Sequence, residues 1–65
     1  MRTEATMRQL IRVLVRKGAS EDLIEAVVTV LETDENFTKM IAELDNVENP
    51  SKTYILGKAM LIADP

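Results

Sequence analysis

The sequence predicts an all-α protein: a small orthogonal bundle of four helices with short loops, or of three helices if the middle two are continuous. Apolar residues recur at the three- and four-residue spacing of an amphipathic helix along most of the chain. Glycine, serine, threonine and proline interrupt this pattern where helices usually begin and end. No stretch alternates apolar and polar residues as a half-buried strand does, and the β-branched residues at 27–30 lie inside a helical pattern.

The chain has 65 residues, with no cysteine and no histidine. We expect a single domain, residues 1–65, because so short a chain exposes too much of its surface to build two cores. The composition excludes disulfides, thiolate or imidazole metal sites and histidine-based acid–base catalysis. A core of this size makes the folded chain only marginally stable, and self-association would raise that stability.

We expect the first helix over residues 3–17 and the second over about residues 21–32. Gly18 suits the position just past a helix end, and Ser20 suits an N-cap, because basic residues precede this turn and acidic residues follow it. The expected core residues of the two helices share helical spacing: Met7, Leu10, Ile11, Leu14, Leu23, Ile24, Val27 and Leu31.

Three arginines follow one another at four-residue intervals on the first helix, about 150° away from its core stripe. This arginine row is Arg8, Arg12 and Arg16. One interpretation is a solvated face whose long side chains also cover apolar neighbours such as Val15. The other interpretation is a surface for an anion or for an acidic partner.

The second helix carries acidic residues at a matching spacing. This acidic row is Glu21, Glu25 and Glu32, with Thr29 in the gap. Residues 1–19 have a net charge of +4, residues 20–48 of −8 and residues 49–65 of +1. Segregation of this kind indicates a contact, either across an antiparallel hairpin or between two copies of the chain, where it could set orientation and encounter rate.

The apolar stripe changes phase between Leu31 and Phe37, since six residues turn about 600°, which leaves the two stripes about 120° apart. We therefore expect a break at residues 33–35, capped by Thr33 or Asp34, and a third helix over about residues 35–45. The expected core residues of this helix are Phe37, Met40, Ile41 and Leu44. The alternative is one long bent helix with a spiralling apolar face.

A fourth helix is expected to begin at Asn49-Pro50, with Asn49 as its N-cap and Pro50 at the first helical position. Its broad core face contains Ile55, Leu56, Ala59, Met60, Ile62 and Ala63. A second stripe lies behind that face and consists of Tyr54, Gly57, Lys58 and Leu61. Because both sides of this helix need neighbours, we expect the second stripe to be a partner interface.

Gly57 is the most unusual residue of this helix, since a glycine inside a helix costs about 1 kcal/mol relative to alanine. We expect it to allow close approach of another helix. The alternatives are a central fourth helix, packed on both sides by its own chain, and a glycine that is merely tolerated at the surface. The methionines at positions 7, 40 and 60 are expected to be adaptable core residues.

No catalytic, cofactor-binding or metal-binding motif is present in the sequence. The acidic clusters lack the alternating ligands and the mid-loop glycine of a calcium-binding loop. Ser20 and Ser51 both lie at expected helix starts, where capping or first-turn roles explain them, and no base other than lysine is near them. We therefore expect no cofactor, no metal and no enzymatic activity.

From these features we expect a small helical protein–protein interaction module that is homodimeric. The alternative is a nucleic-acid-associated regulator that uses the arginine row. A helix-turn-helix shape is compatible with that alternative, but the helix after Gly18 has no basic residue, and the net charge of −3 disfavours nucleic acid. The apolar runs are short and the N-terminus lacks a signal-type stretch, so we expect a cytoplasmic protein without a membrane contact.

Overall fold

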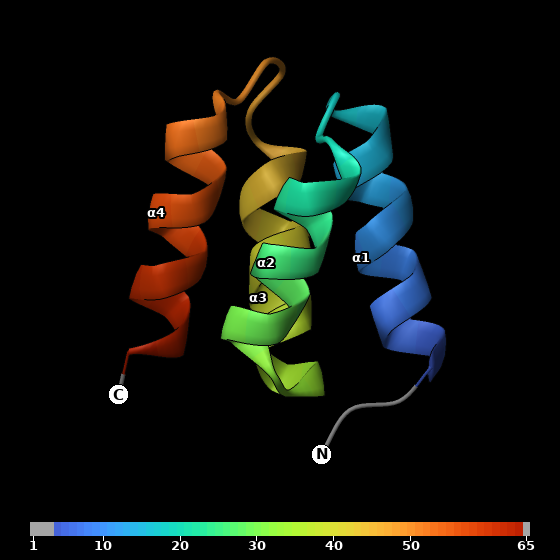
Figure 1. Cartoon of the computed structure of the whole chain (residues 1–65). Helices are drawn as coiled ribbons and strands as arrows, with labels where there is room; N and C mark the ends of the chain where they lie inside the picture. Colours follow the sequence, from blue (N-terminus) through green and yellow to red (C-terminus); the bar gives the residue numbers. More distant parts are fainter. Residues whose placement is uncertain (1–3, 65) are drawn as a thin grey trace.

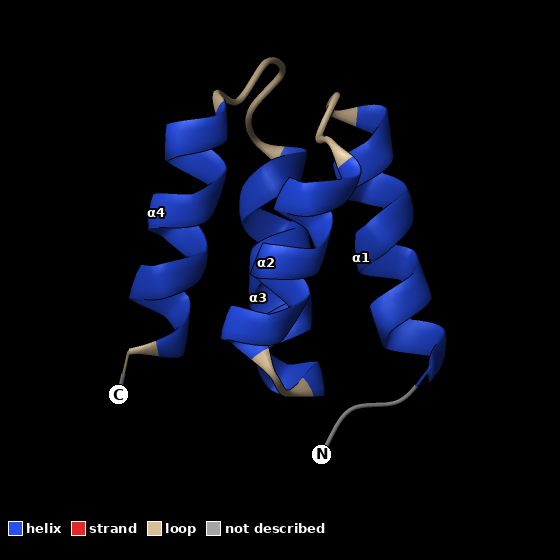
Figure 2. Cartoon of the chain, in the orientation of Figure 1, coloured by secondary structure: helices blue, strands red, loops and turns tan. Residues whose placement is uncertain are grey.

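Residues 4–64 are described in a computed structural model, and within this range the chain forms four α-helices and no strand (Figures 1 and 2). The helices are α1 (Glu4–Arg16), α2 (Glu21–Leu31), α3 (Asp34–Asp45) and α4 (Lys52–Ala63). The prediction of a small all-α four-helix bundle with short loops is confirmed. The alternative of one continuous middle helix is wrong, because α2 and α3 are separate. The expected start of the first helix at residue 3 lies outside the described residues.

Serine and threonine side chains begin three of the helices. The Ser20 hydroxyl oxygen accepts a hydrogen bond from the Leu23 N–H at 3.3 Å, and that of Thr33 accepts from the Asn36 N–H at 3.2 Å. Ser20 was expected as a cap, and Thr33 was one of two candidates, the other being Asp34. Both residues have the extended backbone that an N-cap requires. Gly18 has a φ of 86°, which is the left-handed conformation expected just past the end of α1.

The expected start of α4 is wrong by two residues. Ser51, not Asn49, is the N-cap: its hydroxyl oxygen accepts from the Tyr54 N–H at 3.0 Å, and the helix begins at Lys52. Pro50 therefore precedes the cap and does not occupy the first helical position. Asparagine and serine are about equally good N-caps, so the sequence alone does not discriminate between two candidates that lie two residues apart.

The helices run alternately up and down in the view of Figure 1, with α1 and α4 on opposite sides and α2 and α3 between them. The most extensive contacts join α1 to α3 and α2 to α4, whereas α1 does not contact α4. At the top of this view, the Lys17 ammonium group donates a hydrogen bond to the Val47 carbonyl oxygen at 2.6 Å, which joins the α1–α2 turn to the α3–α4 loop.

The core is apolar, and each helix contributes to it. The buried residues are Leu10, Val13, Leu14, Leu23, Val27, Leu31, Phe37, Met40, Leu44, Ile55 and Ala59. Other expected core residues are half-buried at its edge: Met7, Ile11, Ile24, Ile41, Leu56 and Ala63. Val13 was not expected in the core. Among residues 4–64, no side-chain nitrogen or oxygen is buried without a hydrogen-bond partner.

One expected core residue lies at the surface. Met60 is 58% exposed, although the sequence places it on the broad apolar face of α4. The inward direction of α4 is set by Ile55 and Ala59, and Met60 is one residue, or about 100° around the helix, beyond Ala59. Because α4 carries apolar residues around most of its circumference, the sequence did not define which of them point inward.

Candidate functional site

The outward face of α4 carries an exposed apolar surface. Gly57 is exposed, Met60 is 58% exposed and Leu61 is 69% exposed. An open, shallow groove runs along this face and is lined by Val30, Gly57, Met60, Leu61, Ala63 and Asp64. We call this surface the α4 patch. A contiguous apolar surface rimmed by polar residues can mark an interaction site.

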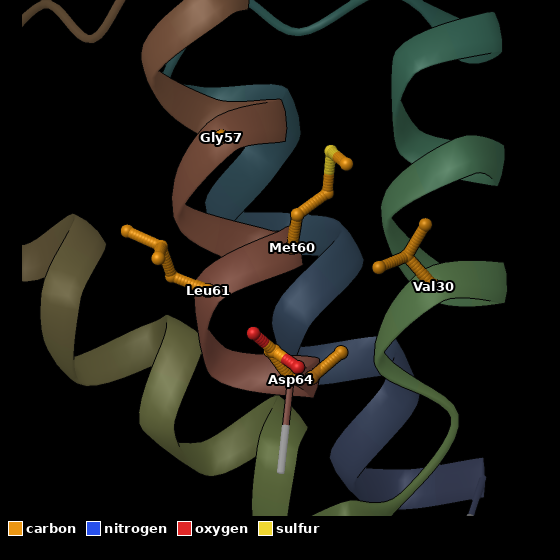
Figure 3. A pocket seen from close by; sticks show the side chains of 6 residues that line it. Val30, Gly57, Met60, Leu61 and Asp64 are labelled. Atoms are coloured by element: carbon orange, nitrogen blue, oxygen red, sulfur yellow. The ribbon is translucent and has the colours of Figure 1, made fainter.

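The shape of the α4 patch follows from helical geometry. At about 100° per residue, Gly57 lies between Met60 and Leu61 around the outward face. Figure 3 shows Met60 on the side of α4 that faces Val30 of α2, while Leu61 points to the other side. The patch is therefore a gap at Gly57 with an apolar side chain on each flank. Val30 and Met60 were not expected in it, and only the arrangement of α4 beside α2 reveals them.

Gly57 packs against no other part of the chain within residues 4–64. A Cβ atom added at Gly57 would meet no heavy atom within 4 Å outside its immediate helical neighbourhood. The alternative in which α4 is packed on both sides by its own chain is therefore wrong. The backbone at position 57 also needs no glycine. A positive φ, which favours glycine, is found at Gly18 and Glu32 but not at Gly57.

The other two residues of the expected interface point elsewhere. Tyr54 and Lys58 are both half-buried, and the Lys58 ammonium group lies 3.6 Å from a carboxylate oxygen of Glu43 on α3. The same ammonium group lies 5.7 Å from the centre of the Tyr54 ring, within the range of a cation–π contact. Tyr54 and Lys58 thus border the α4 patch on its α3 side, whereas Gly57 and Leu61 form part of the patch itself.

The arginine row lies on the exposed surface of α1. Arg8, Arg12 and Arg16 are all exposed, and Arg8 pairs with Glu4 of the same helix at 2.6 Å. Arg12 and Arg16 make no ion pair within residues 4–64. No ion pair in this range joins α1 to α2. The matching rows of charge on these two helices are therefore not used to hold the hairpin together.

The acidic clusters and the two serines at helix starts were the candidates for metal binding or catalysis. Within residues 4–64 no three acidic side chains lie close enough together to hold a metal ion. Ser20 and Ser51 are occupied as helix caps, since each hydroxyl oxygen accepts a main-chain N–H. None of the four helices is both long enough and apolar enough to cross a bilayer, as far as residues 4–64 show.

The chain matches no family model, no curated protein and no solved structure.

Proposed function

We propose that this protein is a small helical interaction module that forms a homodimer through the α4 patch, without catalysis. The observation that carries this proposal is Gly57, a helix-interior glycine in the middle of an exposed apolar surface with open space around it. Such a glycine costs about 1 kcal/mol in helix stability relative to alanine. No contact among the described residues offsets that cost, whereas close packing of a second helix against the outward face would do so.

A second copy of the same chain fits this surface because the patch is complementary to itself. Gly57 and Leu61 lie one helical turn apart, so one is a gap in the surface and the other a projection from it. In a two-fold dimer with antiparallel α4 helices, Leu61 of each copy would fill the gap at Gly57 of the other. Two-fold interfaces are reciprocal: when residue i of one copy contacts residue j of the other, residue j of the first copy also contacts residue i of the second.

Such an interface must extend beyond these two residues. A stable dimer typically covers about 800 Å² on each partner. Val30 and Met60 continue the apolar surface from Gly57 towards α2 (Figure 3). Ala63 continues it towards the end of the helix. Packing a second α4 along this groove would cover all three residues as well as Gly57 and Leu61.

Sedimentation equilibrium tests this proposal. In a high-salt buffer, which screens contacts between exposed charges, we expect the chain to sediment with twice its monomer mass at micromolar concentration. Gly57→Leu fills the gap and Leu61→Lys removes the projection, so each variant should be monomeric. Ala42→Lys, which adds charge at an exposed position of α3, should remain dimeric as a control.

An exchange of the two residues distinguishes specific packing from a general loss of apolar surface. The double variant Gly57→Leu/Leu61→Gly again places a leucine opposite a glycine across the two-fold axis. We expect it to recover the dimer that Gly57→Leu alone loses. A wild-type chain that is monomeric at every concentration, with its helix content intact, would contradict the proposal.

The second candidate function is nucleic-acid binding through the arginine row. It is favoured by one observation, the exposure of this row on α1 with Arg12 and Arg16 unpaired within the described range. The acidic row on the neighbouring helix opposes nucleic-acid binding.

We also propose that the protein is cytoplasmic. Imaging of the tagged protein in cells would test this location.

A further inference from the structure

A second apolar groove runs between α1 and α2, and it shares no residue with the α4 patch. Its apolar side chains are Met7, Ile11, Val15, Ile24 and Val28. Val15 is 59% exposed and the other four are half-buried, so the groove is an open apolar surface and not a closed part of the core. We call it the α1–α2 groove.

The two edges of the α1–α2 groove carry opposite charges. Glu21 and Glu25 line it on the α2 side. On the α1 side, Val15 lies between Ile11 and the arginine row around the helix, at about 100° per residue. The charged side chains of both edges are exposed, and none of the ion pairs within residues 4–64 crosses the groove.

The residues of the arginine row and of the acidic row lie at matching heights along the groove. Arg16 ends α1 and Glu21 begins α2, and the short turn between them places both at the same end of the bundle (Figure 1). Arg12 and Glu25 each lie four residues, or about one turn, further from that end. At equal heights along the groove, one edge is therefore basic and the other acidic.

We propose that the α1–α2 groove is a second self-association surface, in which two copies face each other about a two-fold axis parallel to the helices. This axis places α1 of each copy over α2 of the other. The five apolar side chains of both grooves then form one shared core, and Arg12 of each copy meets Glu25 of the other. A two-fold axis perpendicular to the helices would instead oppose arginine to arginine and glutamate to glutamate, which is electrostatically unfavourable.

This contact does not depend on the α4 patch, because the two surfaces have no residue in common. A chain that uses both would form assemblies larger than a dimer. The two contacts also differ in their response to salt. The α4 patch is almost entirely apolar, whereas charge complementarity orients the α1–α2 groove contact and should weaken as salt screens the exposed charges.

The test uses the Leu61→Lys chain, in which the α4 patch is disrupted, at low salt. We expect this chain to form a concentration-dependent dimer in sedimentation equilibrium, and we expect added salt to dissociate it. Arg12→Glu and Glu25→Arg each create two like-charge contacts, so each should weaken association at least about tenfold. Both residues lie away from the helix ends, so these reversals leave the charges at the helix termini unchanged.

The combined variant Arg12→Glu/Glu25→Arg gives the decisive result, because the exchanged charges attract again across the axis. We expect it to associate within about threefold of the parent chain. Lys39→Glu, on the exposed face of α3, is the control for a change in net charge and should have little effect. A helical but monomeric parent chain at low salt would overturn the proposal, and so would a combined variant no better than the single reversals.

Discussion

The main-chain N–H of Thr33 donates a hydrogen bond to the carbonyl oxygen of Leu31, only two residues before it, at 2.8 Å. The residue between them, Glu32, has a φ of 68° and a ψ of −41°, close to a γ-turn with positive φ. Asn36 supports this turn, because its side-chain amide donates to the same Leu31 oxygen at 2.8 Å. The chain thus reverses from α2 to α3 through a strained residue that two hydrogen bonds hold in place.

This strain predicts that Glu32→Gly stabilises the protein. A non-glycine residue in a sparsely populated conformation costs about 1–3 kcal/mol, and glycine adopts a positive φ freely. We expect the free energy of unfolding to rise by about 1 kcal/mol, measured by urea denaturation with circular dichroism. Glu25→Gly is the matched control, since the same change inside α2 should lower stability by about 1 kcal/mol. Equal losses for both variants would show that Glu32 is unstrained.

The different burial of two methionines predicts different effects of the same substitution. Met40 is fully buried, so Met40→Ala should cost about 2–5 kcal/mol through lost apolar burial and a cavity. Met60 is 58% exposed, so Met60→Ala should change stability by less than about 0.5 kcal/mol. Both are best measured in the Leu61→Lys chain, where the proposed α4 contact does not contribute. A large loss for Met60→Ala in that chain would place Met60 in the core.

The cap of α4 can be identified by removing each candidate in turn. Ser51→Ala removes the oxygen that accepts from the Tyr54 N–H and should cost about 1 kcal/mol. Asn49→Ala should be close to neutral, because Asn49 is exposed and does not cap the helix. Thermal unfolding followed by circular dichroism gives both values. The reverse order would restore the helix start that the sequence predicts.

Much of the fold could be predicted from local chemistry. Gly18, Ser20 and Thr33 mark helix ends through interactions within a few residues, and a phase change in the apolar stripe separates α2 from α3. These signals are local, so they can be read without knowing how the helices pack. The strained conformation of Glu32 has no such signal, because glutamate has no preference for positive φ and only the tight connection imposes it.

The interaction surfaces were predicted only in part. The exposure of Gly57 and Leu61 was expected from a helix with apolar residues on more than one side. Which of the remaining residues join them depends on packing, since Met60 and Val30 line one groove only because α4 lies beside α2. The same is true of the α1–α2 groove, whose two edges are defined by the spacing of two helices and not by either helix alone.

The acidic row predicts weak binding to nucleic acid. Glu21 and Glu25 of the acidic row lie across the α1–α2 groove from the arginine row, and the whole chain has a net charge of −3. We expect no retardation of a mixed-sequence DNA duplex in a gel shift at near-physiological salt. Replacing Arg8, Arg12 and Arg16 by glutamate is the control at low salt. Retardation that persists near physiological salt and is lost in this variant would favour the nucleic-acid function instead.

Single-cysteine cross-linking tests most directly whether a second copy covers the α4 patch. The natural chain has no cysteine, so Met60→Cys introduces one thiol in the patch, and Ala42→Cys introduces one at an exposed site on α3. Because Gly57 and Leu61 meet reciprocally in the proposed dimer, the two-fold axis passes level with residue 59, so the two copies of residue 60 lie close together. Under mild oxidation in high salt, we predict rapid formation of disulfide-linked dimers for Met60→Cys and little for Ala42→Cys. Equal, slow cross-linking of the two variants would contradict self-association through α4.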